Sequence, residues 1–281
     1  MADADRFDFY GAHYRRFGGG LAADLRREVY GEGDVGQTGW RTGEEQAEIA
    51  ELLGLGPGVH VLDVACGAGG PSLDLAERTG CRLTGLDIEP AGVARAEAEA
   101  ATRGLADRVT FRALDCGGPL PFADGAFDAA LCVDALVHLP DRSAALREWA
   151  RLLRPGGRLL FADAAVLTGP VAKGELDARA AQGAFLLVPP GCNEAAVAAA
   201  GLALLRREDR TEAVAAIAGR WHAARARHAP ALEREEGADW FARRQRFLEV
   251  TAALAAGRRL SRFLYLAEKP VGAASWSLPA A

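Results

Sequence analysis

The chain has 281 residues, half of them hydrophobic, which is enough for one α/β domain with appendages or for two small domains. Its 33 basic and 38 acidic residues leave a net charge of -5, which argues against a dedicated nucleic-acid binder. Five cysteines without CxxC spacing, the lack of an apolar leader at the N-terminus and the lack of a long apolar run favour a reduced, cytoplasmic protein without a membrane span.

Residues 1–57 precede the first predicted strand and show helical patterns joined by the glycine-rich loop YGEGDVGQTGW. Tyr10 and Tyr14 share one face of the first predicted helix. We expect residues 1–57 to form a helical lid.

Residues 58–163 alternate short apolar runs with helical patterns. Because the runs lack the alternation of a half-exposed sheet, they indicate a parallel sheet with helices on both faces. Pro71 and Pro90 suit the first turns of two helices, and Pro155-Gly156-Gly157 is expected to turn the chain into the fifth strand. The predicted strands are residues 59–64, 81–87, 109–113, 127–133 and 158–163.

After residue 163 the alternation of strand and helix patterns is interrupted. Residues 164–200 are rich in alanine and are predicted to form a cap inserted after the fifth strand. Residues 201–281 are expected to complete the core with strands at 202–208 and 262–267. The helices predicted between them, at 212–256, would help to form an acceptor pocket.

The run VLDVACGAGG places a glycine loop between a predicted strand and a predicted helix, as in nucleotide-binding folds. A triphosphate loop would need Lys-Ser/Thr where Pro71-Ser72 stands, and a dinucleotide loop would need glycine at Ser72. The carboxylate of Asp63, late in the strand, would repel a pyrophosphate but attract an ammonium group near a sulfonium. These residues favour S-adenosylmethionine over NAD or ATP.

Two further acids follow the next predicted strands. Asp87 stands twenty residues after Gly67, where a carboxylate can accept ribose hydroxyls in either S-adenosylmethionine or a dinucleotide. Asp115 follows the third strand and can accept a hydrogen bond from an adenine amino group. Ligands of open α/β sheets bind at the edge where these three acids would meet.

The runs VLDVACGAGG, GLDIEP, LDCGGPLPFADGAFDAALCVDALVHLPD and LLRPGGRLLFAD resemble, in order and spacing, the class I S-adenosylmethionine-dependent methyltransferases of small-molecule type. The resemblance implies a Rossmann-like, seven-stranded, mostly parallel sheet with an antiparallel last strand. It also implies S-adenosylmethionine as cofactor and S-adenosylhomocysteine as product. The implied cofactor-binding residues are Asp63, Ala65, Gly67 and Gly69 for the methionine part, Asp87 for the ribose, Ile88, Asp115 and Cys116 for the adenine, and Cys132, whose backbone closes the site.

The acceptor side is less defined. His138, in DALVHLPD, is either a general base near the methyl group or a histidine bonded to a carbonyl at a helix end. Tyr10, Tyr14 and Trp221 are candidate acceptor contacts, and Gln37 and Trp40 candidate contacts to the methionine end, although the aromatic residues suit ordinary packing equally well.

We therefore expect a methyltransferase that acts on an O, N or C atom of a small molecule, in specialised metabolism, as a monomer or homodimer and without a metal. The alternatives are a non-methylating step such as cyclisation, a non-catalytic S-adenosylmethionine sensor, and a nicotinamide-dependent oxidoreductase.

Overall fold

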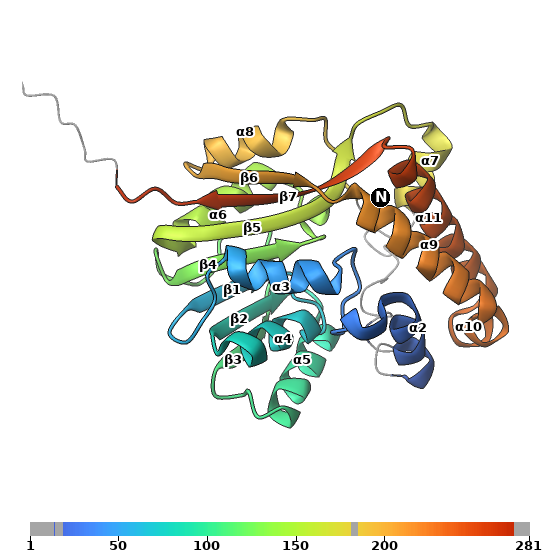
Figure 1. The fold of residues 1–281 in the computed structure, drawn as a ribbon, viewed down its shortest axis with the longest axis horizontal. Helices are drawn as coiled ribbons and strands as arrows, with labels where there is room; N and C mark the ends of the chain where they lie inside the picture. Colours follow the sequence, from blue (N-terminus) through green and yellow to red (C-terminus); the bar gives the residue numbers. More distant parts are fainter. Residues whose placement is uncertain (1–13, 15–18, 181–184, 273–281) are drawn as a thin grey trace, which may run out of the picture.

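The computed structural model describes residue 14 and residues 19–180 and 185–272, which fold around a seven-stranded sheet of order β3-β2-β1-β4-β5-β7-β6 (Figure 1). The first five strands are parallel, and β7 runs antiparallel to both of its neighbours. The strands are β1 His60–Val64, β2 Arg82–Asp87, β3 Val109–Ala113, β4 Phe127–Val133, β5 Leu153–Leu167, β6 Ala203–Asp209 and β7 Leu260–Glu268. The predicted Rossmann-like fold with an antiparallel last strand is confirmed.

The fifth strand is longer than the sequence predicted. The residues Pro155-Gly156-Gly157 do not form a turn before the strand. They lie within β5 itself. Phe127 of β4 pairs with Leu153, whereas Ala129 pairs with Arg158, so the extra residues of β5 form a bulge. The prediction of a turn at this position was therefore wrong.

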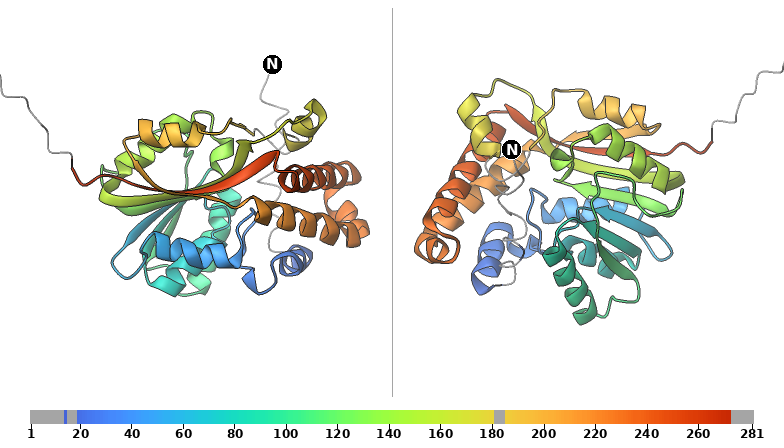
Figure 2. Two further views of the ribbon diagram at one scale, coloured as in Figure 1. Left: turned by 45° about the horizontal axis from the view of Figure 1, so that its top comes forward. Right: turned by 180° about the vertical axis from the view of Figure 1, so that it is seen from behind.

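Helices cover both faces of the sheet, as Figure 2 shows from two sides. On one face α3 Gly43–Leu52, α4 Gly70–Thr79 and α5 Pro90–Thr102 pack on a core that includes Ile49, Leu73 and Leu160. On the other face α6 Arg142–Leu152 and α8 Cys192–Ala199 pack on a core centred on Trp149 and Phe161.

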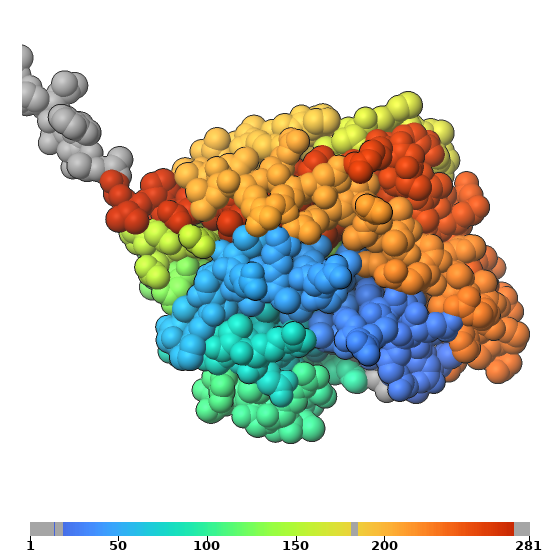
Figure 3. Space-filling view, in the orientation of Figure 1, coloured from blue at the N-terminus to red at the C-terminus, as the bar shows by residue number. Residues whose placement is uncertain are grey.

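The remaining helices gather at one end of the sheet. Leu260, which begins β7, pairs with Leu167, which ends β5, so the preceding helix α11 lies at the carboxyl ends of the parallel strands. Figure 3 shows α2 beside the C-terminal helices, and α2 and α9 are in contact. The helices at this end are α2 Gly20–Tyr30, α7 Lys173–Ala180, α9 Thr211–Arg227, α10 Ala229–Glu236 and α11 Ala238–Ala256.

Within residues 1–57 the structure describes α2, the short 3-10 helix η2 Gly31–Gly33 and α3. The described helix α2 packs on α9, and it is the loop after η2 that lies against the start of α4, because a Cβ atom on Gly70 would come within 2.3 Å of the Val35 carbonyl oxygen. Across the described residues, none of the helices combines the length and apolar character needed to span a membrane.

Candidate functional site

The glycine loop joins β1 to α4 in a left-handed backbone conformation. Ala65, Gly67 and Gly69 all have positive φ, of 58°, 61° and 75°. For Ala65 this conformation is strained, as is common at functional sites. The carboxylate of Asp87 fixes the loop, because its Oδ2 atom accepts a hydrogen bond from the Gly67 N–H at 2.7 Å. Its Oδ1 atom accepts one from the Glu89 N–H at 2.9 Å.

Asp63 lies beneath this loop and is buried. The Ser72 hydroxyl donates a hydrogen bond of 2.5 Å to its Oδ2 atom. Burial raises the pKa of the Asp63 carboxyl to about 6, against the opposing effects of the Arg41 charge and the Ser72 hydrogen bond. This carboxyl therefore titrates near neutral pH.

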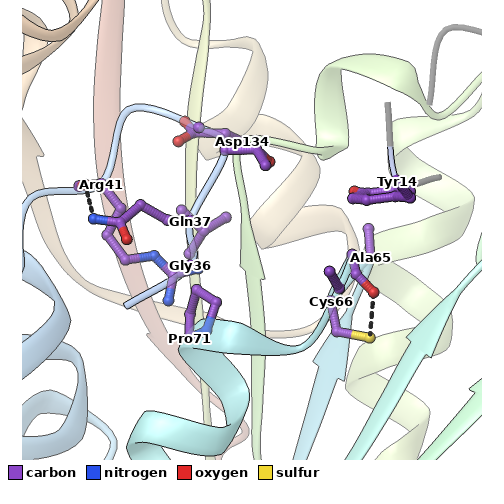
Figure 4. A pocket seen from close by; sticks show the side chains of 13 residues that line it. Tyr14, Gly36, Gln37, Arg41, Ala65, Cys66, Pro71 and Asp134 are labelled. Atoms are coloured by element: carbon purple, nitrogen blue, oxygen red, sulfur yellow. Dashed lines mark hydrogen bonds between the residues drawn. The ribbon is translucent and has the colours of Figure 1, made fainter. Parts of the chain in front are cut away.

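A small cavity of about 60 Å³ lies over the glycine loop (Figure 4). This volume would hold about two water molecules at ~30 Å³ each. Figure 4 shows Arg41 and Gln37 on one side and Tyr14 on the other, above Ala65. The lining residues are Tyr14, Gly36, Gln37, Thr38, Gly39, Arg41, Ala65, Cys66, Gly67, Ala68, Pro71, Val133 and Asp134.

Two loop residues contribute polar groups to this cavity. The side chain of Gln37 holds the loop together, since its Nε2 atom donates to the Gly33 carbonyl at 2.7 Å and its Oε1 atom accepts from the Val35 N–H at 2.8 Å. Arg41, which the sequence interpretation missed, is buried and donates from Nη1 to Gln46 Oε1 at 2.6 Å. An arginine in a polar loop gives no sequence signal for burial.

Asp134 closes the cavity at the end of β4 and has a strained φ of 58°. Its Oδ2 atom accepts from the Trp40 N–H and its Oδ1 atom from Arg262 Nε, each at 2.7 Å. Arg262 is fully buried and also makes two hydrogen bonds of 2.7 Å to Glu45. This buried network ties the loop over the cavity to α3 and β7.

The four predicted adenine-side and site-closing residues differ in their exposure to solvent. Ile88 is 63% exposed although it is a large apolar residue. Asp115 is exposed and accepts a hydrogen bond of 2.8 Å from the Gly117 N–H. Cys116 and Cys132 are buried, and burial raises the pKa of the Cys116 thiol to about 12, so this thiol stays protonated.

The predicted acceptor residues are separated by the structure. His138 ends the 3-10 helix η3 Leu136–His138, and its ring contacts Phe185 edge-on, with centroids 4.6 Å apart. Tyr14 packs on Ala68. Trp221 instead lies in a helical cluster and donates from Nε1 to the Tyr30 hydroxyl at 3.1 Å.

Trp40 does not line the cavity. Its ring stacks on Phe247 of α11, with centroids 6.4 Å apart, and only its backbone N–H reaches Asp134. Tyr10 lies outside the described residues. The structure thus brings Gln37, Tyr14 and the glycine loop together around the cavity, but places Trp40 and Trp221 in helical packing.

Comparison with known proteins identifies the sheet region. Residues 62–161 match the family model described as a methyltransferase domain. The chain is 41% identical over 125 residues to methyltransferase GfsG of Streptomyces halstedii, covering 44% of this chain and 45% of that protein. It is 37% identical over 122 residues to the 27-O-demethylrifamycin SV methyltransferase of Amycolatopsis mediterranei, covering 43% and 44%. The match thus spans less than half the length of these curated relatives.

A solved structure covers far more of the chain. The [4+2]-cyclase SpnF is 27% identical, covers 90% of this chain and 94% of its own, and superposes with a TM-score of 0.72. The helices outside residues 62–161 are therefore shared with at least one known fold. Together with the glycine loop, its acids and the strand order, these matches show that residues 62–161 form a methyltransferase domain of the class I S-adenosylmethionine-dependent type.

Proposed function

We propose that this protein transfers a methyl group from S-adenosylmethionine to an O, N or C atom of a small-molecule acceptor in specialised metabolism. The observation that carries the proposal is a cavity lined by residues Ala65 to Ala68 of the glycine loop. Asp87 accepts a hydrogen bond from the Gly67 N–H of this loop, and Asp63 accepts one from Ser72 just beyond it. The relatives named as methyltransferases support the reaction type, and the rifamycin relative supports a natural-product acceptor.

The buried groups fit the cofactor in charge and shape. The loop from Ala65 to Gly69, with the Asp63 charge beneath it, would hold the cationic methionine part. Asp87 would take the ribose with the lone pairs that its backbone N–H donors leave free. The exposed Ile88 offers an apolar surface for the adenine ring, and Asp115 and Cys116 would meet its edge.

When bound, S-adenosylmethionine supplies an electrophilic methyl group on a cationic sulfur. The contribution of the protein is alignment of the acceptor in line with that methyl group and exclusion of water. The cavity is too small for a nucleoside, so we assign Tyr14 and the loop over α4 to a lid that moves when the ligand enters. In this proposal the lid comprises residues 1–57 and the cap comprises residues 164–200.

His138 is the proposed general base for acceptors that must lose a proton. It lies just after β4, four residues from the cavity-lining Asp134, and Phe185 of the cap covers its ring. His138→Gln should lower kcat by about 100-fold while the Kd for the cofactor changes little. The pH profile of kcat checks this role, and a variant that keeps the full rate across pH would remove it.

A second candidate function is a non-methylating step such as cyclisation in the same fold. The similarity to the [4+2]-cyclase SpnF over 90% of the chain favours it specifically. Under this alternative the product would gain no methyl group and its mass would equal that of the substrate.

The test is a mass-spectrometric screen of metabolite extracts with S-adenosylmethionine that carries an isotopically labelled methyl group. Methyl transfer predicts a labelled product and S-adenosylhomocysteine in equal amounts. A product of unchanged mass would support cyclisation instead. Calorimetric titration with S-adenosylhomocysteine and NAD accompanies the screen, and tight binding of NAD alone would contradict both functions.

A further inference from the structure

Residues 185–188 lie against η3 beside His138, and we call them the covering segment. The Phe185 ring meets the His138 ring edge-on, with centroids 4.6 Å apart. The next residue donates from its backbone N–H to the Val137 carbonyl at 2.8 Å, and the last residue of the segment donates to the Ala165 carbonyl at 2.9 Å. The covering segment is thus bonded to η3 on one side and to β5 on the other.

The covering segment is not deeply buried. Leu186 is 42% exposed, and Phe185 is partly buried. The backbone carbonyl of Leu186 accepts a hydrogen bond from Arg142 Nη2 at 3.1 Å. Because a hydrogen bond from a charged donor is stronger than one between neutral groups, Arg142 is well suited to hold a segment that lies near the surface.

Arg142 is itself fixed from three sides. It is the first residue of α6, whose start is set by the Asp141 carboxylate, which accepts from the Ala144 N–H at 2.8 Å. Its side chain is 8% exposed and donates from Nη1 to Asn193 Oδ1 of α8. Asp163 Oδ2 of β5 lies 3.6 Å from the same nitrogen and attracts the guanidinium charge without forming a hydrogen bond. A guanidinium held in this way can keep the covering segment in one place.

We propose that Arg142 is a positioning residue that holds the covering segment, so that Phe185 stays on His138 and keeps water from the base. Within the described residues Arg142 donates to the segment and to α8, and it acts on His138 through Phe185. Water excluded from a base cannot compete with the acceptor for it. This inference rests on the proposed function, because it takes His138 as the base.

The experiment measures how easily a reagent reaches His138. The protein is treated with diethyl pyrocarbonate, which acylates accessible imidazoles, and mass spectrometry of its peptides gives the rate at each histidine. Arg142→Met should raise the rate at His138 about tenfold, because losing a charged hydrogen bond raises the population of the displaced segment by about that factor. The partly buried His60 of β1 and His222 of α9 should keep their rates.

Three further variants separate positioning from a general loss of structure. Phe185→Ala should raise the rate at His138 by itself, and adding Arg142→Met should then have little further effect, because Arg142 acts through Phe185. Arg142→Lys keeps the charge without the planar fork, so its rate should lie between those of the wild type and Arg142→Met. Arg147→Met removes a charge from an exposed position of the same helix and should change nothing.

Arg142→Met also leaves the buried Asp163 without its nearest cation. Should that variant not fold, the double variant Arg142→Met/Asp163→Asn removes both charges together and should show the same rise at His138. An unchanged rate at His138, an equal rise at all histidines, or additive effects of Arg142→Met and Phe185→Ala would overturn the assignment.

Calorimetric titration with S-adenosylhomocysteine accompanies these measurements. The variants should bind it with the Kd of the wild type, because Arg142 is assigned to the acceptor side. A wild type that does not bind it would contradict the proposed function, whereas the rates at His138 would still decide whether Arg142 holds the covering segment.

Discussion

At the scale of single residues, two buried carboxyls differ in their surroundings and therefore in what they can do. Asp63, in β1, accepts a hydrogen bond from the Ser72 hydroxyl and feels the charge of Arg41. Asp163, in β5, is fully buried, and neither of its oxygens has a hydrogen-bond donor among the described residues. Its neighbour Arg142 comes no closer than 3.6 Å and donates instead to Asn193.

The titration of Asp63 predicts that cofactor binding depends on pH. Because its pKa is about 6 and only the ionised form attracts an ammonium group, affinity should rise about tenfold as pH increases from 5 to 7. Asp63→Asn should bind more weakly at pH 7.5 and show a flat profile. Ser72→Ala, which removes a hydrogen bond to the carboxylate, should move the midpoint to higher pH. Calorimetry across pH checks all three, and a wild-type profile without a step near pH 6 would contradict the role of Asp63.

Asp163 predicts a different pH effect, on stability. Burial raises the pKa of its carboxyl to about 7, and the Arg142 charge opposes this only in part. The folded state then holds its proton more tightly than the unfolded state, so this group lowers the free energy of unfolding as pH rises from about 4 through about 7. Asp163→Asn should therefore stabilise the protein at pH 8, by about 2 kcal/mol, and change little at pH 4. Urea denaturation at both pH values measures this, and an equal effect at both would exclude titration of Asp163.

At the scale of elements, the loop between η2 and α3 is held by contacts that reach across the chain. Arg262 of β7 binds Glu45 of α3 and Asp134 after β4, and Asp134 holds the Trp40 N–H. The three side chains are buried or nearly so, so the network is shielded from water and salt.

Removing the centre of this network should be costly. Arg262→Met would leave two buried carboxylates unpaired and should lower the free energy of unfolding by about 3–5 kcal/mol. The control is Arg158→Met, because Arg158 is 41% exposed and pairs with Glu268 at 3.4 Å, an arrangement expected to contribute less than about 1 kcal/mol. Denaturation curves of both variants give the comparison. An equal decrease in the free energy of unfolding for both variants would show that the buried network contributes no more than the exposed ion pair.

An element could be predicted from the sequence where neighbouring residues determine it, and could not where contacts between distant residues determine it. The strands around Val61, Leu83 and Phe111 were predicted because apolar runs between glycine and proline signals are a local property. The docking of α2 on α9 depends on residues about 190 positions apart, such as Tyr30 and Trp221, and no local pattern encodes it. The stacking of Trp40 on Phe247 could not be predicted for the same reason, because Phe247 is distant in sequence.

The residues of the candidate site also fall into those that could be predicted from the sequence and those that could not. Asp63, Gly67 and Asp87 could be found because motif spacing places them at strand ends, where the topology brings them together. Arg41 could not, because its burial arises from Gln46 and the first turn of α4 rather than from its own neighbours in sequence.

At the scale of the whole molecule, the sheet separates two cores, and β7 contributes to both. Leu264 belongs to the core under α3, α4 and α5, whereas Tyr265 belongs to the core under α6 and α8. The outermost strand β6, by contrast, exposes Leu205 to solvent by 50%.

Because Leu264 is buried and Leu205 is half-exposed, replacing each by alanine should change the free energy of unfolding by different amounts. Leu264→Ala should leave a cavity and lower the free energy of unfolding by about 2–5 kcal/mol. Leu205→Ala, on the exposed edge, should change it by no more than about 0.5 kcal/mol. Chemical denaturation of the two variants provides the test, and a small loss for Leu264→Ala would contradict the placement of β7 in the core.

The position of β7 between β5 and β6 also has a consequence for how the protein is made. On the ribosome, residues 203–209 emerge some fifty residues before residues 260–268. Until then β6 lacks its partner strand, because among the described residues its neighbour in the finished sheet is β7, the strand still to be translated. Nascent chains should therefore hold an incomplete, five-stranded parallel sheet, with the free side of β5 open to chaperones or to other nascent chains.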